Sequence, residues 1–356
     1  MSSNNSKNIE ISWIFETEIS NMNAGEGSSN LKELKTYNNG LPYISGQSMR
    51  HALRQSMKRE HENCFKCTPE FPCGDIKKCW TCDLFGFLLP SSGSKRWSPI
   101  KASPALGQIR NNITTDLIFR NVADIKCPGC KKKIYPLSAR DSSTKTIKKG
   151  SKLICPFCDK DFEAPYDIRQ ALAYKQLTNN IYKTSLSIDL DNIGVEKVPK
   201  ISDDKMDGVE TITSIESKEK YNRISAILNG IYNLADFANQ SREMVNASPD
   251  FIIISLQSQY NHRLASVLKI DENGNINIPH FESIIKEILT DNDNKIYMGL
   301  ISGIITNEKE FKSKIEEISN NNNTNCNFFN SPKTAIDECL KEIGDKYLKE
   351  TKDEDK

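Results

Sequence analysis

The sequence has no apolar run approaching the roughly 20 residues that a membrane-spanning helix needs, which argues against an integral membrane protein. It begins MSSNNSKNIE, without a basic stretch followed by an apolar block, so we expect no secretory signal and a cytoplasmic setting. Histidine is scarce, and the four residues at positions 51, 61, 262 and 280 suggest no pairing with a nucleophile. We therefore expect no enzymatic activity.

Net charge is nearly absent as well, since the formal value for the whole chain is +1. The charges are unevenly distributed, however: residues 61–165 carry +8 and residues 166–356 carry −8. Charge counts alone favour an ordinary solvated surface. The basic segment is also the one rich in cysteine, and that combination shifts the interpretation towards a polyanionic partner.

The 356 residues are 37% apolar and 27% charged, which is typical of a globular chain with two domains or one elaborated domain. Alternation predicts a strand over Ile9–Ile19, with Glu10, Ser12 and Glu16 on its polar side. A later strand-helix-strand-helix pattern indicates an α+β sheet with helices on one face. The expected later elements are a helix at Tyr221–Ala238, strands at Phe251–Ile254 and Tyr297–Ile305, a helix at Ile284–Leu289 between them, a linker at Asn320–Asn325 and a last helix.

Nine of the eleven cysteines lie between residues 64 and 158. Cys127 and Cys130 form one CPxC turn, and Cys155 and Cys158 form a second. Two such turns supply four thiolates for a tetrahedral zinc ion, and the lysines that follow each turn favour ionised thiols. Disulfides are the first alternative, but they conflict with the missing secretion signal. An iron–sulfur cluster is the second, although the spacing is that of a zinc ribbon.

The other five cysteines predict a second zinc site. The pairs Cys64–Cys67 and Cys79–Cys82 are the first choice of ligands, with Cys73 as a substitute. His61 competes for a place, and ligands from the two groups could mix. All-cysteine sites are closed, so we expect both zinc ions to be structural and not catalytic.

The segment Leu41–Gln55, LPYISGQSMRHALRQ, predicts a glycine-containing turn that leads into a helix over Ser48–Glu60. Free N–H groups at the start of this helix, with the side chains of Gln47, Ser48 and Arg50, suit a phosphate backbone. Arg54 projects from the same face one turn later. A capped surface helix with two solvated arginines is the alternative interpretation.

This segment resembles the CRISPR-associated family known as DevR, the repeated backbone subunit of type I Cascade complexes. Two further motifs follow in the expected order: CWTCDLFG, ending at Gly86, and NQSREMVNASPDFIIIS, which contains Arg242. The likeness covers about residues 9 to 260, and the cysteine pairs are most similar to the type I-B branch. The C-terminal hundred or so residues match only in general character.

The resemblance implies an RRM-like (ferredoxin-like) palm with a zinc-containing finger insertion and a thumb. Residues 1–60 would begin the palm, 61–165 would form the finger, and 166–319 would complete the palm, with the thumb at about 180–215; residues 320–356 would be a linker and a frayed C-terminal helix. The guide-RNA contacts implied by the resemblance are Ser45, Gln47, Ser48, Arg50, Arg54 and Arg242.

The resemblance also implies partners. These are the guide RNA (crRNA), the target DNA strand paired to it, further copies of the chain, the guide 5′-end-capping, large and small subunits, and a recruited helicase-nuclease. In such complexes the proteins hold the shape and backbone of the guide, while base pairing supplies the sequence specificity used in antiviral defence.

The sequence leaves two other functions open. A related type III backbone subunit cleaves target RNA with an aspartate in an early loop, but the matching loop here, SNMNAGEGSSN, contains Glu26 and no aspartate. The other rival is a zinc-ribbon DNA-binding regulator, which would bind duplex DNA without guide RNA.

Overall fold

The computed structural model describes residues 6–23, 31–90, 93–121, 125–134, 148–165, 170–202, 205–238, 243–321 and 325–349. The chain divides into two compact units. The first unit comprises Met1–Ala24, Lys35–Asn112 and Thr178–Lys356, and the second comprises Gly25–Leu34 and Ile113–Leu177. Residues 61–165, expected to form one finger insertion, are therefore divided: the part up to Asn112 packs in the first unit and the rest in the second.

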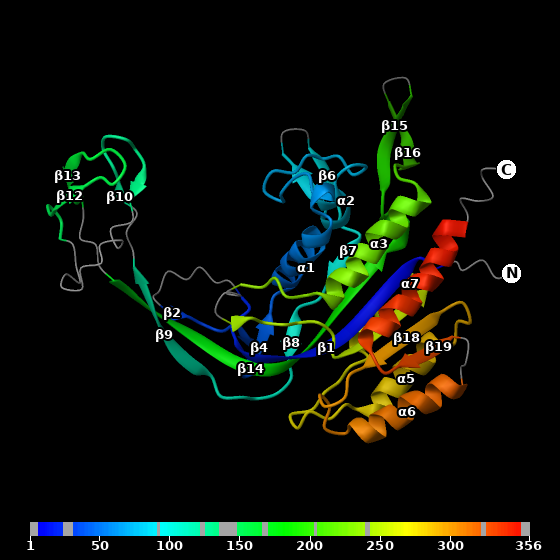
Figure 1. Ribbon diagram of the computed structural model, residues 1–356. Helices are drawn as coiled ribbons and strands as arrows, with labels where there is room; N and C mark the ends of the chain where they lie inside the picture. The colour runs from blue at the N-terminus through cyan, green and yellow to red at the C-terminus, as the bar shows by residue number, and fades with distance from the viewer. Residues whose placement is uncertain are drawn as a thin grey trace. The chain divides into compact units, whose positions relative to one another are not determined.

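The first unit is built on a large mixed sheet (Figure 1). Its strands follow the order β19–β18–β17–β1–β14–β8–β4–β3, and β7 also pairs with β14. β18 and β19 are parallel, whereas β1 is antiparallel to both β14 and β17. The strands are β1 (Asn8–Ser20), β3 (Thr36–Tyr37), β4 (Leu41–Ile44), β7 (Ile100–Ala102), β8 (Ala105–Gly107), β14 (Gln170–Asp189), β17 (Phe251–Gln257), β18 (Lys295–Leu300) and β19 (Cys326–Phe329).

Two apolar cores cover the two faces of this sheet. On one face Ile9, Ile11 and Trp13 of β1 pack with the helices α1 (Gly46–Glu60), α3 (Ser217–Tyr232) and α7 (Pro332–Lys349). On the other face Ile14 of β1 packs with α5 (Ile278–Ile288) and α6 (Glu308–Asn321). The expectation of helices on one face only is wrong. The strands β17 and β18 present apolar side chains to both faces of the sheet, and helices pack on each face to bury them.

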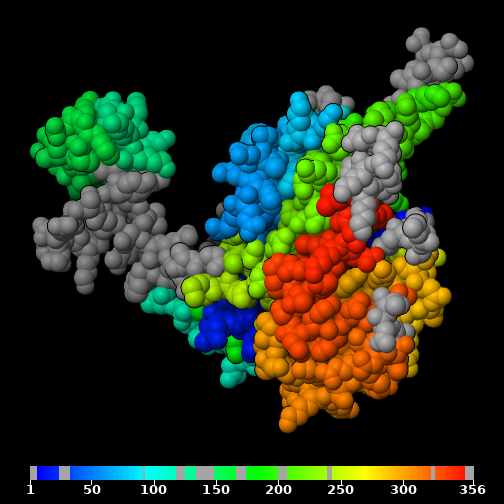
Figure 2. Space-filling view, turned by 45° about the vertical axis from the view of Figure 1, so that its right-hand side comes forward, coloured from blue at the N-terminus to red at the C-terminus, as the bar shows by residue number. Residues whose placement is uncertain are grey.

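The predicted helices and strands occur, with shifted ends. The helix expected at Tyr221–Ala238 begins four residues earlier and ends at Tyr232, and the short one expected at Ile284–Leu289 is the longer α5. Figure 2 shows α7, in red, on the surface of this unit beside the orange region of the chain. Within the described residues, no helix is both long enough and apolar enough to cross a bilayer.

Short elements complete the first unit. After α1 come the 3₁₀ turn η1 (Glu62–Cys64) and the helix α2 (Trp80–Phe85), followed by the hairpin β5 (Phe87–Leu89) and β6 (Ser94–Arg96). After β14, the 3₁₀ turn η3 (Leu190–Asn192) leads into a two-stranded hairpin of β15 (Val195–Ser202) and β16 (Lys205–Thr213), and η4 (Arg263–Ser266) follows β17. The range expected for a thumb, 180–215, thus holds the end of a core strand and this hairpin.

In the second unit, residues 170–177 of β14 pair with β9 (Thr114–Asn121) and with β2 (Leu31–Lys32). Two short hairpins follow, each beside one CPxC turn. They are β10 (Ile125–Lys126) with β11 (Lys133–Ile134), and β12 (Lys152–Ile154) with β13 (Asp161–Glu163).

Candidate nucleic-acid interface and metal centres

The turn before α1 is fixed by its own side chains. Ser45 is the N-cap, with extended backbone (φ −64°, ψ 147°), and its Oγ accepts the backbone N–H of Ser48 at 3.2 Å. The Ser45 N–H donates to Asn23 Oδ1 at 3.1 Å. A Cβ on Gly46 would lie 3.0 Å from the carbonyl oxygen of Ala102, so glycine allows α1 to begin close against β7.

A hollow of about 340 Å³ opens at this helix start. It is lined by three of the predicted RNA-binding residues, Ser45, Gln47 and Ser48, and by residues from elsewhere in the first unit, namely Met22, Lys35, His51 and Asp236 to Ala238. The first turn of α1 contains no acidic residue, so its partial positive charge is not offset there. Gln47 and Lys35 are exposed. The hollow can therefore take an anionic group, and Lys35 is a member that the local motif did not reveal.

The guanidinium group of Arg50 is hydrogen-bonded within the protein. Its guanidinium donates to Ser98 Oγ at 3.1 Å, to the Ile100 carbonyl at 2.5 Å and to the Phe85 carbonyl at 2.8 Å. Burial, followed by the charge of Arg54, lowers the pKa of this guanidinium. Arg50 thus ties α1 to the segment from Phe85 to Ile100, a role that the sequence motif did not predict.

Arg54 is less constrained. Its Nη2 lies 3.1 Å from His51 Nδ1, and since a guanidinium only donates, that ring nitrogen is the acceptor. Its guanidinium also lies 5.6 Å from the centroid of the Phe85 ring, as does that of Arg50. Arg54 lines a second, smaller hollow of about 130 Å³ with Lys58. The remaining predicted contact, Arg242, lies outside the described residues.

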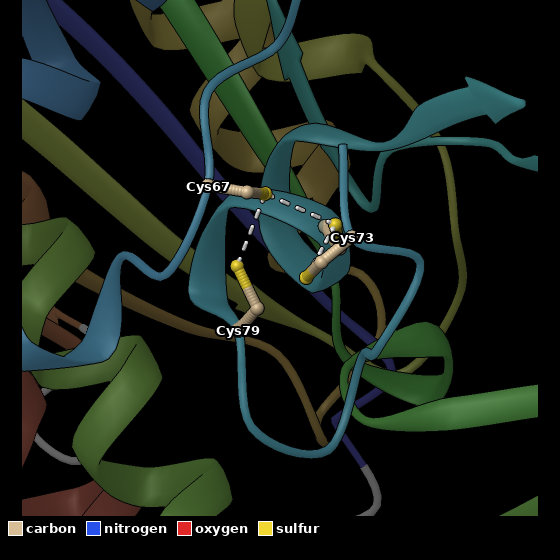
Figure 3. Close-up of side chains that lie close together, drawn as sticks. Cys67, Cys73 and Cys79 are labelled. Atoms are coloured by element: carbon tan, nitrogen blue, oxygen red, sulfur yellow. Dashed lines mark hydrogen bonds between the residues drawn. The ribbon is translucent and has the colours of Figure 1, made fainter. Parts of the chain in front are cut away.

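The first cysteine group gathers Cys67, Cys73, Cys79 and Cys82. Figure 3 labels the first three of them. The Sγ atom of Cys67 lies 3.4 Å from those of Cys79 and Cys82, and Cys73 Sγ lies 3.6 Å from Cys82 Sγ. The four sulfurs come from the loop before α2 and from α2 itself, and the N–H of Gly74 donates to Cys82 Sγ at 3.3 Å.

Cys64, part of the first-choice ligand set, is not in this group. The substitute, Cys73, takes the fourth place. The physical reason is local: Cys64 ends the 3₁₀ turn that directly follows α1, and there it packs against the main apolar core. Cys73 is instead brought to the group by a turn at Gly74, whose φ of +77° favours glycine.

The second cysteine group is the predicted one, Cys127, Cys130, Cys155 and Cys158. Cys127 Sγ lies 3.6 Å from Cys158 Sγ, and Cys130 Sγ lies 3.6 Å from Cys155 Sγ. The two turns share one geometry, because the residue after each, Lys131 or Asp159, has a left-handed backbone (φ 62° and 53°). We call residues 125–134 and 148–165 the ribbon.

Both groups fit a zinc ion. A tetrahedral site with Zn–S bonds near 2.3 Å has sulfurs about 3.8 Å apart, close to the distances above. Backbone N–H groups donate to the sulfurs in both groups, as outer-shell partners of thiolate ligands do. All eleven cysteines carry free thiols, and the sulfurs within the groups are too far apart for disulfide bonds.

The thiol pKa values differ within each group: burial raises the pKa of Cys67 and Cys82, and the pKa of Cys158 is raised as well, whereas one thiol in each group has a lowered pKa. The N–H of Cys130 lowers the pKa of Cys127 to about 6, helped by the N–H of Gly129, although burial opposes the shift. Burial also raises the pKa of Cys79, but hydrogen bonds from Cys82 and Cys67 outweigh it and lower that pKa to about 7. Each group thus holds one readily ionised thiol beside others that donate to it.

A buried ion network joins the first cysteine group to α3 and to the start of the β15–β16 hairpin. Asp83, between Cys82 and Leu84 on α2, is fully buried and ion-paired to both Arg223 and Arg96. Arg223 also donates to the Ile76 carbonyl at 2.9 Å, and Arg96 donates to the Val195 carbonyl at 2.7 Å. No local motif marked these residues, since the partners are separated by up to 147 positions in the chain.

Gly86 explains the last letter of the CWTCDLFG motif. Its φ is +75°, and a Cβ there would lie 2.6 Å from the Arg96 carbonyl oxygen, so only glycine ends α2 this way without strain. The motif thus encodes the turn that places Phe85 against Arg50 and Arg54.

The family comparison covers the first two of the three motifs, LPYISGQSMRHALRQ and CWTCDLFG, but not the third, which begins at residue 239. Residues 11–126 match the model of a family described as "CRISPR-associated negative auto-regulator DevR/Csa2". That segment contains α1, its hollow-lining residues up to His51 and the first cysteine group, and it ends just before the second group. A comparison with curated proteins finds no match.

Among solved structures, the chain is similar to one titled "CRISPR RNA-guided surveillance complex", with a TM-score of 0.49 and 11% sequence identity; the match covers 94% of this chain and 99% of that chain. It is also similar to one titled "CRISPR RNA-guided surveillance complex, pre-nicking", with a TM-score of 0.49, 9% identity and the same coverage.

Proposed function

We propose that this chain is a guide-RNA-binding backbone subunit of a CRISPR surveillance complex and that it catalyses no reaction. The observation that carries the proposal is the hollow at the start of α1, where Ser45, Gln47, Ser48 and Lys35 meet a first helical turn without acidic residues. The one carboxylate in the lining, that of Asp236, is ion-paired to Arg59. The match of residues 11–126 to the DevR/Csa2 family supports it, because that segment includes this turn and helix.

In this proposal the RNA backbone lies along the start of α1. Gln47 and Lys35 supply an amide and an ammonium group for phosphate oxygens, and the free N–H groups of the first helical turn add further donors. Arg54 contacts the chain further along the helix, whereas Arg50 holds the segment from Phe85 to Ile100 in place. Arg242 is a further contact in the proposal.

The finer assignments belong to the same proposal. The mixed sheet is the RRM-like palm, the hairpin of β15 and β16 is the thumb, and the complex is of type I-B. The chain binds further copies of itself along the guide, with the target DNA strand and the other Cascade subunits as partners, in the cytoplasm. Zinc would be held by Cys67, Cys73, Cys79 and Cys82 and by Cys127, Cys130, Cys155 and Cys158, where it would cross-link loops that have little apolar core.

The proposal can be tested by fluorescence anisotropy with a labelled guide-like RNA. We expect Lys35→Ala combined with Gln47→Ala to weaken binding by about tenfold, since one phosphate ion pair and one hydrogen bond are lost. The slope of log K against log salt should also flatten, by about 0.7 for the lost cation. The matched control is Lys309→Ala combined with Gln259→Ala, which removes the same two residue types at exposed positions outside the hollow. Equal affinities for the two double variants would refute the role of the hollow.

A DNA-binding regulator is the second candidate, and the description of the matching family as a negative auto-regulator favours testing it. Such a regulator binds duplex DNA tightly without guide RNA. Titration of the full chain with duplex DNA and with single-stranded RNA of equal length separates the two functions. The type III-like nuclease requires metal-dependent RNA cleavage by the assembled complex. Most of its candidate loop, from position 24 to position 30, lies outside the described residues.

A further inference from the structure

The ribbon carries an exposed aromatic side chain, Phe157, that lies outside its apolar core. The apolar centre of the ribbon consists of Ile125, Leu153 and Phe162, beside the sulfurs of Cys127 and Cys155. Phe157 takes no part in either cluster: it occupies the CPxC turn between Cys155 and Cys158, and its side chain is 55% exposed. Ile154, one residue before the same turn, is 68% exposed. The Phe157 ring thus adds nothing to this small core, and its exposed face is open to a partner.

Lysines surround this ring. The ammonium group of Lys132, from the other CPxC turn, lies 5.0 Å from the centroid of the Phe157 ring. Lys160, which follows the second turn, passes close to Gly129 of the first: a Cβ on Gly129 would lie 2.8 Å from Lys160 Cδ. Each turn therefore has a lysine from the opposite turn reaching over it.

The charge of the ribbon is one-sided. Its described residues include eight lysines against three acidic residues, at positions 126, 131, 132, 133, 148, 149, 152 and 160 and at 159, 161 and 163 respectively. Even with the two negative charges of a zinc-bound cysteine tetrad, the balance stays positive. The partner should therefore be an extended polyanion.

We propose that the ribbon is a separate binding site for single-stranded nucleic acid, in which one nucleobase stacks on Phe157 and the adjoining phosphates pair with Lys132 and Lys160. An exposed ring offers a face to any base, and the Lys132 ammonium group, 5.0 Å from the ring centroid, is a nearby cation for an adjoining phosphate. A duplex keeps its bases stacked inside and offers no face to the ring. An acidic protein would use the lysines but would have no flat partner for Phe157.

This site lies wholly within the second unit and does not depend on the hollow at α1. The test therefore uses the zinc-loaded full chain carrying Lys35→Ala and Gln47→Ala, so that loss of one site cannot be mistaken for loss of the other. A 12-nucleotide single strand containing 5-iodouridine is bound and irradiated, and the cross-linked peptide is identified by mass spectrometry. We expect the cross-link at Phe157.

Anisotropy titrations in the same background give the energetics. We expect Phe157→Ala and Phe157→Leu to weaken binding by about five- to a hundredfold, and Phe157→Trp to retain it, because only tryptophan keeps an aromatic face. Phe71→Ala, which removes a phenyl ring that is 83% exposed in the first unit, is the matched control and should leave binding unchanged. The zinc content of each variant, measured by mass spectrometry, reports whether the ribbon is intact.

Three results would overturn the proposal. The first is a cross-link elsewhere together with an unchanged affinity of Phe157→Ala. The second is equal binding of a 12-base-pair duplex, with the same response to Phe157→Leu as the single strand. The third is binding of polyglutamate that depends on Phe157 as strongly as binding of the oligonucleotide does, which would make the surface an acceptor for any polyanion.

Discussion

At the scale of single residues, Glu10 shows what burial does to a polar position in a strand. The alternation in β1 predicts that Glu10 and Ser12 face solvent, yet both are buried, because the 3₁₀ turn η4 and its neighbours cover that side of the sheet. Glu10 accepts the backbone N–H of Leu264 at 2.8 Å and a hydrogen bond from Gln257 at 3.2 Å, and His262 Nδ1 lies 3.9 Å away. Burial is the largest effect on this carboxyl and raises its pKa to about 7.

This shift gives a stability prediction with a definite sign. The carboxyl of Glu10 has a pKa near 4.5 in the unfolded chain and about 7 in the folded chain. Its contribution to the free energy of unfolding is fully present below about pH 4.5 and is lost as the pH rises through about 7. We expect Glu10→Gln to have a free energy of unfolding close to that of the wild type at pH 5, and to be more stable at pH 8 by up to about 3 kcal/mol. Urea denaturation at the two pH values measures the difference. Equal effects at both values would show that Glu10 does not titrate in this range.

Arg50 and Arg54 are one helical turn apart, but their surroundings predict opposite phenotypes. Arg50→Ala removes three hydrogen bonds and leaves the Phe85 and Ile100 carbonyls without this donor, so we expect a loss of about 2–4 kcal/mol in stability. Arg50→Lys should lose nearly as much, since an ammonium group cannot reach the same three acceptors. Thermal unfolding checks both.

Arg54→Ala should leave the stability within about 1 kcal/mol, because its one hydrogen bond is to the exposed side of His51. We expect it instead to weaken binding of guide-like RNA several-fold and to flatten the salt dependence by about 0.7. Arg54→Lys is the matched control and should keep the salt slope. If Arg54→Ala melted early and bound RNA as the wild type does, the two arginines would have exchanged roles.

At the scale of elements, the two cysteine groups show what spacing can and cannot predict. The spacing of Cys127–Cys130 and Cys155–Cys158 was enough to predict the second group. Each of these turns is closed by its own backbone hydrogen bonds, so local sequence determines where its two sulfurs lie. In the first group, five cysteines compete for four places, and the choice depends on where η1 and the turn at Gly74 lead the chain. That is a matter of packing against the main core, which no local spacing encodes.

Metal stoichiometry can decide the ligand set. We expect about two zinc ions per wild-type chain and about one in Cys73→Ser, because the first group loses a ligand. Cys64→Ser is the matched control: it should keep two, since Cys64 packs against the core instead of joining the group. Inductively coupled plasma mass spectrometry of the purified variants gives the ratio. Loss of a metal ion from Cys64→Ser but not from Cys73→Ser would reverse the assignment.

The ion network around Asp83 joins elements that are far apart in the sequence. Asp83 follows directly after a cysteine of the first group, and its two arginine partners come from α3 and from β6. The carboxylate also accepts the N–H of Gly194, just before β15. A metal ion in the first group would therefore fix α2, and through Asp83 the start of the β15–β16 hairpin. Sequence periodicity located α3 but could not place its buried Arg223, because the i,i+4 partner Glu219 on the same helix does not reveal the distant partner Asp83.

At the scale of the whole molecule, the separation of charge along the chain acquires a structural meaning. The ribbon holds much of the basic excess of residues 61–165, whereas the acidic excess of residues 166–356 is spread along that part of the chain, with only a small share in α5, α6 and α7. A polyanion is thus attracted to chosen surfaces and not to the chain as a whole, although the total charge is only +1. The α+β class and several of the main elements could be predicted from periodicity, but the long strand β14 and the helix α6 were not among them. The cover on both faces of the sheet could not be predicted, because it depends on contacts between distant strands and helices.

The proposed backbone role makes a prediction about assembly. If each copy grips a fixed length of RNA backbone, the number of copies bound should rise with RNA length, because each added stretch of phosphates offers another site. We expect mass photometry to show few copies on a 12-nucleotide RNA and a stepwise larger number on a 48-nucleotide RNA. Lys35→Ala combined with Gln47→Ala should reduce the occupancy of both, whereas Lys309→Ala combined with Gln259→Ala should leave it unchanged. A single copy on RNA of every length would mean that the hollow at α1 serves a monomeric RNA-binding protein, and the backbone role would have to be abandoned.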